Sequence, residues 1–83
     1  MGEIMAYNIV TLFHCLTEEG AIQHKNKIKE LGFIPSIKET EWGGKKLYMV
    51  YLHNAIEVND CIIQYDVKTH ETNSISWKTL MAA

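Results

Sequence analysis

The side chains in this sequence that could bind a metal ion or attack a substrate are those of four histidines and two cysteines. They are His14, Cys15, His24, His53, Cys61 and His70. None of them lies in the closely spaced pairs that zinc sites use. His14 and Cys15 are neighbours in an expected strand, so their side chains point to opposite faces of the sheet. We therefore expect no metal ion and no cofactor.

A small enzyme or metal protein that uses Cys61 and a histidine is the third functional hypothesis. The sequence contains no Gly-x-Ser-x-Gly, no phosphate-binding loop and no dinucleotide fingerprint. Its paired acids at 18–19 and at 39 and 41 are typical of a helix start and of a solvated strand face. A free cysteine most often serves as a small buried hydrophobic side chain. We expect no catalytic residue.

Nucleic-acid binding is the second hypothesis, because several lysines lie near aromatic residues. Lys25 and Lys29 share a face of an expected helix, and Lys45 and Lys46 lie at an expected hairpin. Ammonium groups can hold phosphates while exposed aromatic rings stack on bases. The formal net charge of −2 argues against this function, since nucleic-acid-binding domains usually carry a basic excess. All 8 basic residues are lysines, so no guanidinium is present to recognise a base edge.

The first elements that must position these side chains are a strand and a helix. Residues 4–15 are rich in β-branched and aromatic side chains, which predicts a strand. Thr17 can cap a helix over residues 18–31, and His24 lies on its apolar stripe as an expected core histidine. Gly32 follows at the position where a left-handed residue ends a helix.

A β-hairpin is expected after the helix. Residues 33–42 have an extended pattern, and Pro35 favours an edge or a strand start. Gly43-Gly44 tolerates the positive φ angles of a tight hairpin turn. Residues 47–52, Leu-Tyr-Met-Val-Tyr-Leu, give the strongest strand signal in the chain.

The last third of the chain allows two interpretations. Residues 55–67 fit a helical stripe, but they also alternate and are rich in β-branched side chains. We favour a strand here, followed by a polar loop over 66–73 and a strand over 74–80, which gives the order β-α-β-β-β-β. The helical alternative gives the ferredoxin-like order β-α-β-β-α-β. Both are a single α+β domain over residues 1–83, with a mostly antiparallel sheet and one principal helix on one face.

Length and composition indicate a small cytoplasmic protein. The 83 residues suffice for one domain and are too few for two. No apolar run approaches the ~18 residues that span a bilayer, and the N-terminus lacks the basic and apolar regions of a signal peptide. The two cysteines are far apart, which favours reduced thiols over a disulfide. We expect no membrane contact.

An apolar second face of the sheet is the strongest indication of function. Along residues 47–52, the side chains of Leu47, Met49 and Tyr51 point to one face, and those of Tyr48, Val50 and Leu52 to the other. A strand buried on one side only should alternate apolar and polar residues. A helix of ~14 residues is ~21 Å long and covers one face of a small sheet. The other face is then covered by residues 55–67, by the C-terminal tail, or by a partner, of which a symmetric second copy is the commonest.

We therefore expect a non-catalytic protein–protein interaction module that is homodimeric. It would bind or inhibit another protein through a face or an edge of the sheet. Aromatic and methionine side chains are enriched at the centres of interfaces. The expected protein-binding residues are Trp42, Tyr48, Met49, Tyr51 and Trp77. Small arginine-free proteins of this kind are common among phage and mobile-element inhibitors, so an inhibitor is one form of the expected function.

Overall fold

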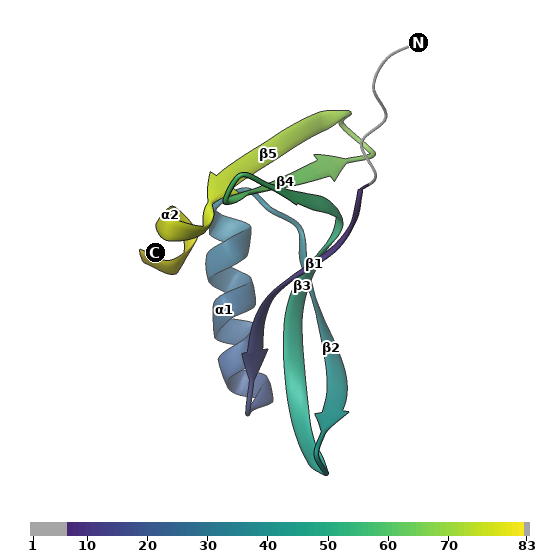
Figure 1. Ribbon diagram of the computed structural model, residues 1–83, viewed down its shortest axis with the longest axis vertical. Coiled ribbons are helices and arrows are strands. Elements are labelled where there is room, and N and C mark those ends of the chain that lie inside the picture. Colours follow the sequence, from purple (N-terminus) through teal and green to yellow (C-terminus); the bar gives the residue numbers. More distant parts are fainter. Residues whose placement is uncertain (1–6, 83) are drawn as a thin grey trace.

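The computed structural model describes residues 7–82, which form an α+β domain around one antiparallel sheet (Figure 1). The elements are β1 Asn8–Cys15, α1 Glu18–Glu30, β2 Pro35–Trp42, β3 Lys45–Val58, β4 Cys61–Asp66, β5 Glu71–Ser76 and α2 Trp77–Ala82. The predicted fold class is confirmed. The predicted first strand is confirmed from Asn8 onward, and its residues 4–6 lie outside the described part.

Helix α1 begins at the predicted cap and ends close to the predicted residue. The Thr17 hydroxyl accepts a hydrogen bond from the backbone N–H of Gly20 at 3.0 Å. At the other end Gly32 has a φ of 98°, which glycine adopts without steric cost. The N–H of Phe33 then donates to the carbonyl oxygen of Ile28 at 3.3 Å, so the chain closes the last turn and leaves toward β2.

The β2–β3 hairpin turns at the predicted glycines. Gly43 and Gly44 have φ angles of 57° and 80°, as a two-residue hairpin turn requires. Strand β3 does not end at residue 52 as predicted but continues to Val58. In Figure 1 the tip of this hairpin projects beyond α1 and β1.

The last third of the chain forms a second hairpin followed by a short helix. The strand interpretation of residues 61–66 is confirmed, and the ferredoxin-like alternative is wrong, because no helix lies between β3 and β4 in the described chain. Asn59 and Asp60, with φ angles of 50° and 65°, make the turn between these strands. The predicted loop over 66–73 is too long and the predicted strand over 74–80 is displaced, because β5 begins at Glu71 and ends at Ser76. The Ser76 hydroxyl accepts from the N–H of Thr79 at 3.1 Å and caps α2.

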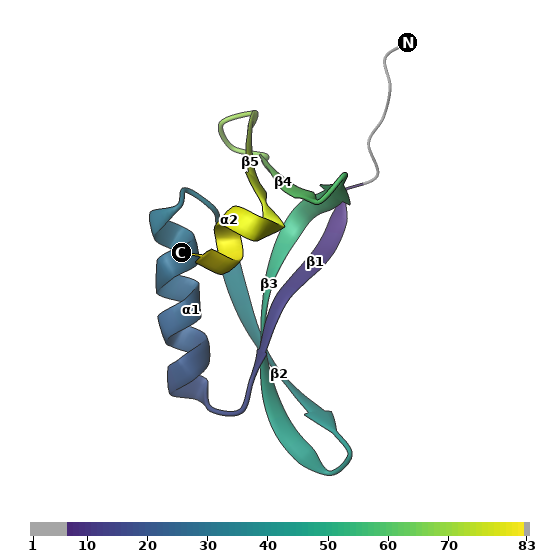
Figure 2. The same ribbon diagram turned by 60° about the vertical axis from the view of Figure 1, so that its left-hand side comes forward.

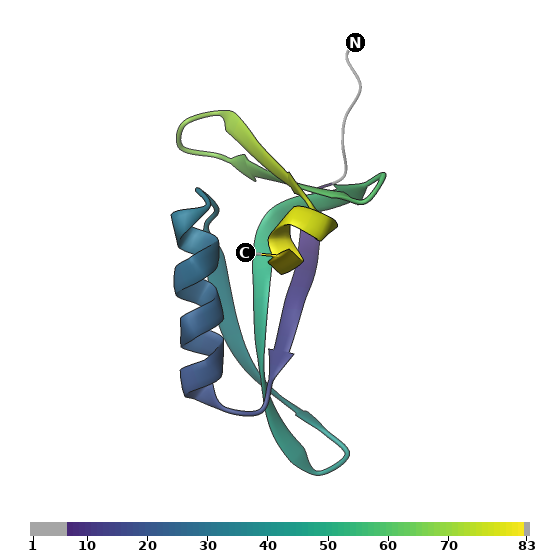
Figure 3. The same ribbon diagram turned by 90° about the vertical axis from the view of Figure 1, so that its left-hand side faces the viewer.

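Strand β3 is the centre of the sheet. β1 pairs with one of its edges, while β2 and then β4 pair in succession with the other, and β5 pairs with β4. Ala55 shows this directly, since it pairs with Asn8 on one side and with Gln64 on the other. Asn54 has a φ of 53° at a register shift of β3 against β1. The β4–β5 hairpin lies across the end of the part of the sheet that β1, β2 and β3 form (Figure 3).

Both helices lie on the same side of the sheet (Figure 2). The buried core between helices and sheet consists of Leu12, Ile28, Phe33, Leu52, Ala55, Ile62 and Leu80. Leu80 comes from α2, so the C-terminal segment covers the same face as α1. A register shift in β1 lets the adjacent Leu12 and Phe13 both join this core, where a regular strand would direct them to opposite faces. Within residues 7–82, no helix has the length and apolar character needed to cross a membrane.

Candidate functional site

Strands β1, β2 and β3 form a sheet whose one face carries the helices, and no described element covers the opposite face (Figures 1 and 2). We call it the open face. Directly paired residues of neighbouring strands share a face, so the pairing register assigns its members. They are Thr11 and His14 from β1, Ser36, Lys38, Thr40 and Trp42 from β2, and Lys45, Leu47, Met49 and Tyr51 from β3. His53 is added by the alternation of β3 after Tyr51, whose ring it contacts.

An apolar row of three side chains runs along the middle of the open face. Leu47, Met49 and Tyr51 are half-buried there, while Val50 and Leu52 between and beside them are fully buried on the helix side. The Thr11 hydroxyl lies 3.4 Å from the Met49 sulfur, which agrees with their common face. This row is the surface that the sequence predicted, and neither α2 nor residues 55–67 cover it.

Three of the five predicted binding residues lie on the open face. Trp42, Met49 and Tyr51 lie on it, with Trp42 78% exposed at the hairpin tip. Tyr48 pairs with Cys15 and Glu39 on the helix side. Trp77 begins α2, where its indole N–H donates to a Glu57 carboxylate oxygen at 2.7 Å. The geometry therefore separates Tyr48 and Trp77 from the other three.

The lysines predicted to bind nucleic acid do not form one patch. Lys25 and Lys29 lie on α1. Lys45 pairs with Trp42 on the open face, whereas Lys46 lies on the helix side with its ammonium 3.6 Å from a Glu39 carboxylate oxygen. The hairpin thus directs adjacent lysines to opposite faces.

Lys38 and Leu47 are members of the open face that the predicted set omits. Lys38 pairs with Met49, and Leu47 with Thr40. The signal was present in the sequence, because Lys38-Glu39-Thr40-Glu41-Trp42 alternates strictly. A strand of period two directs Lys38, Thr40 and Trp42 to one face and both glutamates to the other.

The histidines and cysteines stay dispersed. Within residues 7–82, no three His, Cys, Asp or Glu side chains are grouped as a metal site requires. The His24 ring stacks on Phe13 with centroids 4.1 Å apart, and His70 is hydrogen-bonded through Nδ1 to the Tyr65 hydroxyl at 2.8 Å. Both thiols are free and half-buried, and burial raises the pKa of Cys15, which makes it less nucleophilic at neutral pH.

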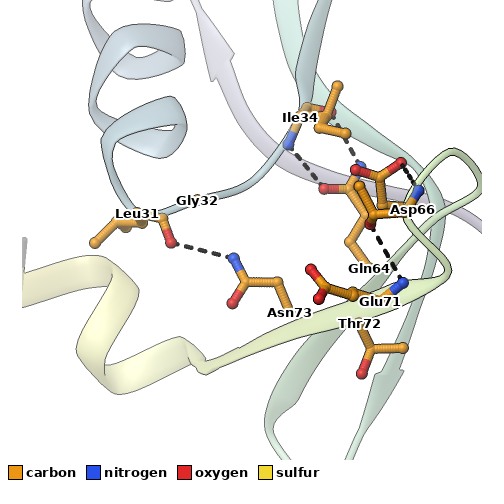
Figure 4. Close-up of a pocket in the computed structure, with 9 residues that line it drawn as sticks. Leu31, Gly32, Ile34, Gln64, Asp66, Glu71, Thr72 and Asn73 are labelled. Atoms are coloured by element: carbon orange, nitrogen blue, oxygen red, sulfur yellow. Dashed lines mark hydrogen bonds between the residues drawn. The ribbon is translucent and has the colours of Figure 1, made fainter.

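A polar cavity of about 310 Å³ lies between the end of α1 and the β4–β5 hairpin (Figure 4). The amide of Asn73 reaches across it and donates to the Leu31 carbonyl at 3.1 Å. Gln64 reaches from β4 to Ile34 and makes hydrogen bonds to both its N–H and its carbonyl oxygen, at 2.8 and 3.0 Å. These hydrogen bonds connect the β4–β5 hairpin to the loop after α1, so the residues that line the cavity have a structural role.

The chain was compared with models of protein families, with curated proteins and with solved structures, and none of them matches it. The functional argument therefore depends on the residues and their geometry alone.

Proposed function

We propose that this chain is a non-catalytic protein-binding domain that binds its partner through the open face. The observation that carries the proposal is the half-buried row of Leu47, Met49 and Tyr51 on a sheet face that no described element covers. A partner that removes the remaining surface of these apolar side chains from water stabilises the complex. Such a module acts as an inhibitor where the surface it covers is the partner's own working site.

The composition of the open face resembles the centre of a protein interface. Tyrosine, tryptophan and methionine are enriched at such centres, and a polar rim surrounds them. Here Met49 and Tyr51 lie in the middle, while Trp42 and Lys45 lie toward the hairpin tip. The Tyr51 ring meets the His53 ring edge-on with centroids 5.0 Å apart, so the two rings form a joint aromatic contact at this end of the row.

The test uses the variant Tyr51→Asp, with Ile22→Asp on the outer surface of α1 as the matched control. Proteins retained from a cell extract by the wild-type chain should be retained by Ile22→Asp and lost by Tyr51→Asp, because a carboxylate at the centre of the interface loses its hydration on binding. Thermal unfolding of both variants checks that they fold. If Tyr51→Asp folds and retains the same proteins as the wild type, the open face is not the binding surface.

A homodimer belongs to the same proposal, and we place it at the outer edge of β1. That strand contains no charged residue and no proline, whereas β2 carries Pro35 and charged residues and β5 carries Glu71. Natural sheets protect their edges with such residues, so an uncharged edge is suited to pairing with another strand. Two β1 strands related by a two-fold axis would bring no like charges together, and the dimer would leave the open face free.

A further inference from the structure

We infer that the open face binds an acidic protein segment whose aspartates or glutamates flank apolar side chains. This inference rests on the proposed function and names the chemistry of the partner. The charged members of the open face are Lys38 and Lys45, and the described β1, β2 and β3 residues of that face include no carboxylate. Asp66 borders the face only at its far end, where it lines a hollow with Ser36, His53 and Lys68. The sign is opposite to the formal net charge of −2 of the whole chain.

The separation of charge is built into the β2–β3 hairpin. Glu39 and Glu41 alternate with Lys38 along β2 and point to the helix side, where Glu39 makes its ion pair with Lys46. The remaining open-face residues with polar side chains are threonine, serine and histidine, none of which carries a negative charge. An approaching surface therefore meets an apolar row with a cation on the β2 side, at Lys38, and another near the tip, at Lys45.

This charge pattern disfavours a second copy of the chain as the occupant of the open face. A two-fold copy would set Lys38 and Lys45 against the same two lysines, and the described strand residues of that face offer no carboxylate to pair with them. Like charges at a desolvated interface oppose association. Carboxylates on the partner would instead pair with both lysines at the rim of the apolar contact.

An acidic protein segment also fits the open face better than a nucleic acid does. Two lysines neutralise two phosphates, so the logarithm of the binding constant for a single strand would fall with the logarithm of the salt concentration at a slope of only about −1.4. The rings of Trp42 and Tyr51 also lie on this face, but Leu47 and Met49 lie between them, so the rings do not form a continuous platform on which successive bases could stack.

A displayed library of random peptides, selected on the wild-type protein, tests the inference. We expect the enriched peptides to carry Asp or Glu beside apolar residues and to bind Tyr51→Asp at least about tenfold more weakly. The double variant Lys38→Glu/Lys45→Glu should weaken their binding by about tenfold, since two attractions become repulsions. The control Lys29→Glu/Lys78→Glu makes the same change of charge at exposed positions of α1 and α2, away from the open face, and should bind as the wild type does.

The outcomes separate the two claims. Peptides that depend on Tyr51 but show no acidic excess and tolerate Lys38→Glu/Lys45→Glu would overturn the acidic partner and leave the protein-binding face standing. If no peptide is enriched, or if the enriched ones bind Tyr51→Asp unchanged, both claims fail. Oligothymidine is titrated in parallel, and binding tighter than that of the peptides and lost in Tyr51→Asp would overturn the inference in favour of a single-stranded nucleic acid.

Discussion

Strand β2 pairs with β3 as far as Leu52, and β4 pairs with the same edge of β3 from Ala55 onward. Between them, the side-chain amide of Gln64 makes the hydrogen bonds that backbone pairing makes elsewhere. It accepts from the N–H of Ile34 and donates to the carbonyl oxygens of Ile34 and His53, at 2.8, 3.0 and 2.9 Å. Only 6% of Gln64 is exposed, so its own amide would otherwise be buried without partners. One side chain thus connects the end of the α1–β2 loop, the bend of β3 and the second hairpin.

Gln64→Leu should lower the free energy of unfolding by about 2–4 kcal/mol, because it removes three hydrogen bonds that join separate segments of the chain. Urea unfolding measures the change. Gln23→Leu makes the same substitution at an exposed position of α1 and should change stability by less than about 0.5 kcal/mol. Equal, small effects of the two variants would contradict the role of Gln64.

Asp66 organises the turn between β4 and β5. Its carboxylate accepts from the N–H groups of Lys68 and Thr69 at 2.9 and 3.4 Å, and its carbonyl accepts from the N–H of His70 at 2.8 Å. The hydrogen bond from the Lys68 backbone N–H, above all, lowers the pKa of Asp66 from its ordinary value of 3.8. The carboxylate form is therefore the one that stabilises the turn.

This shift predicts the direction of a pH effect. A lowered pKa in the folded state contributes stability that is present above pH 3.8 and is lost as the pH falls through the folded value. Asp66→Asn should therefore be less stable than the wild type at pH 6, and the difference should shrink at pH values below the folded pKa. NMR titration of the Asp66 carboxyl gives that value, and a result at or above 3.8 would contradict the account.

At the scale of elements, the sequence predicted the ends of α1 and the turn of the first hairpin. Thr17 and Gly32 define α1, and Gly43-Gly44 defines the first hairpin, because caps and turns depend on neighbours in sequence. The length of β3 could not be predicted, since Ala55 to Val58 extend only because β4 pairs with them. Helix α2 was missed although Ser76 caps it, because its alternating sequence suits a strand and its packing through Leu80 is a tertiary contact.

The uncharged edge of β1 leads to a prediction about association. Ile9 is 50% exposed on β1 and Ile22 is 44% exposed on α1, so the same substitution can be compared at the two sites. Light scattering should give about 19 kDa for the wild type, twice the 9.5 kDa of the chain, and the same for Ile22→Lys. Ile9→Lys puts a charge on each of the two β1 edges that would pair, a device by which natural sheets prevent edge-to-edge pairing, and should give a monomer.

A wild-type monomer at all accessible concentrations would exclude the homodimer. A dimer that persists in Ile9→Lys but dissociates in Tyr51→Asp would move the contact from the edge of β1 to the open face.

Residues 7–82 form a one-sided arrangement in which α1 and α2 cover one face of a bent sheet and no described element covers the other. The sequence predicted the uncovered row, because residues 47–52 are apolar on both sides while only one principal helix was evident. It did not predict that α2 returns to the face that α1 already covers. It also did not separate Tyr48 from Met49 and Tyr51 as binding residues, because residue type alone does not say which face a partner would reach.

The central claim is that the open face, and not the helix side, contacts the partner. Two methionines report on the two sides, because Met49 lies on the open face and Met81 lies 52% exposed on α2. Their ¹³C-labelled methyl signals are followed by NMR while a peptide selected on the wild-type protein is titrated. We predict that the Met49 signal shifts with saturation and the Met81 signal stays in place. A shift of Met81 with an unchanged Met49 would contradict the account.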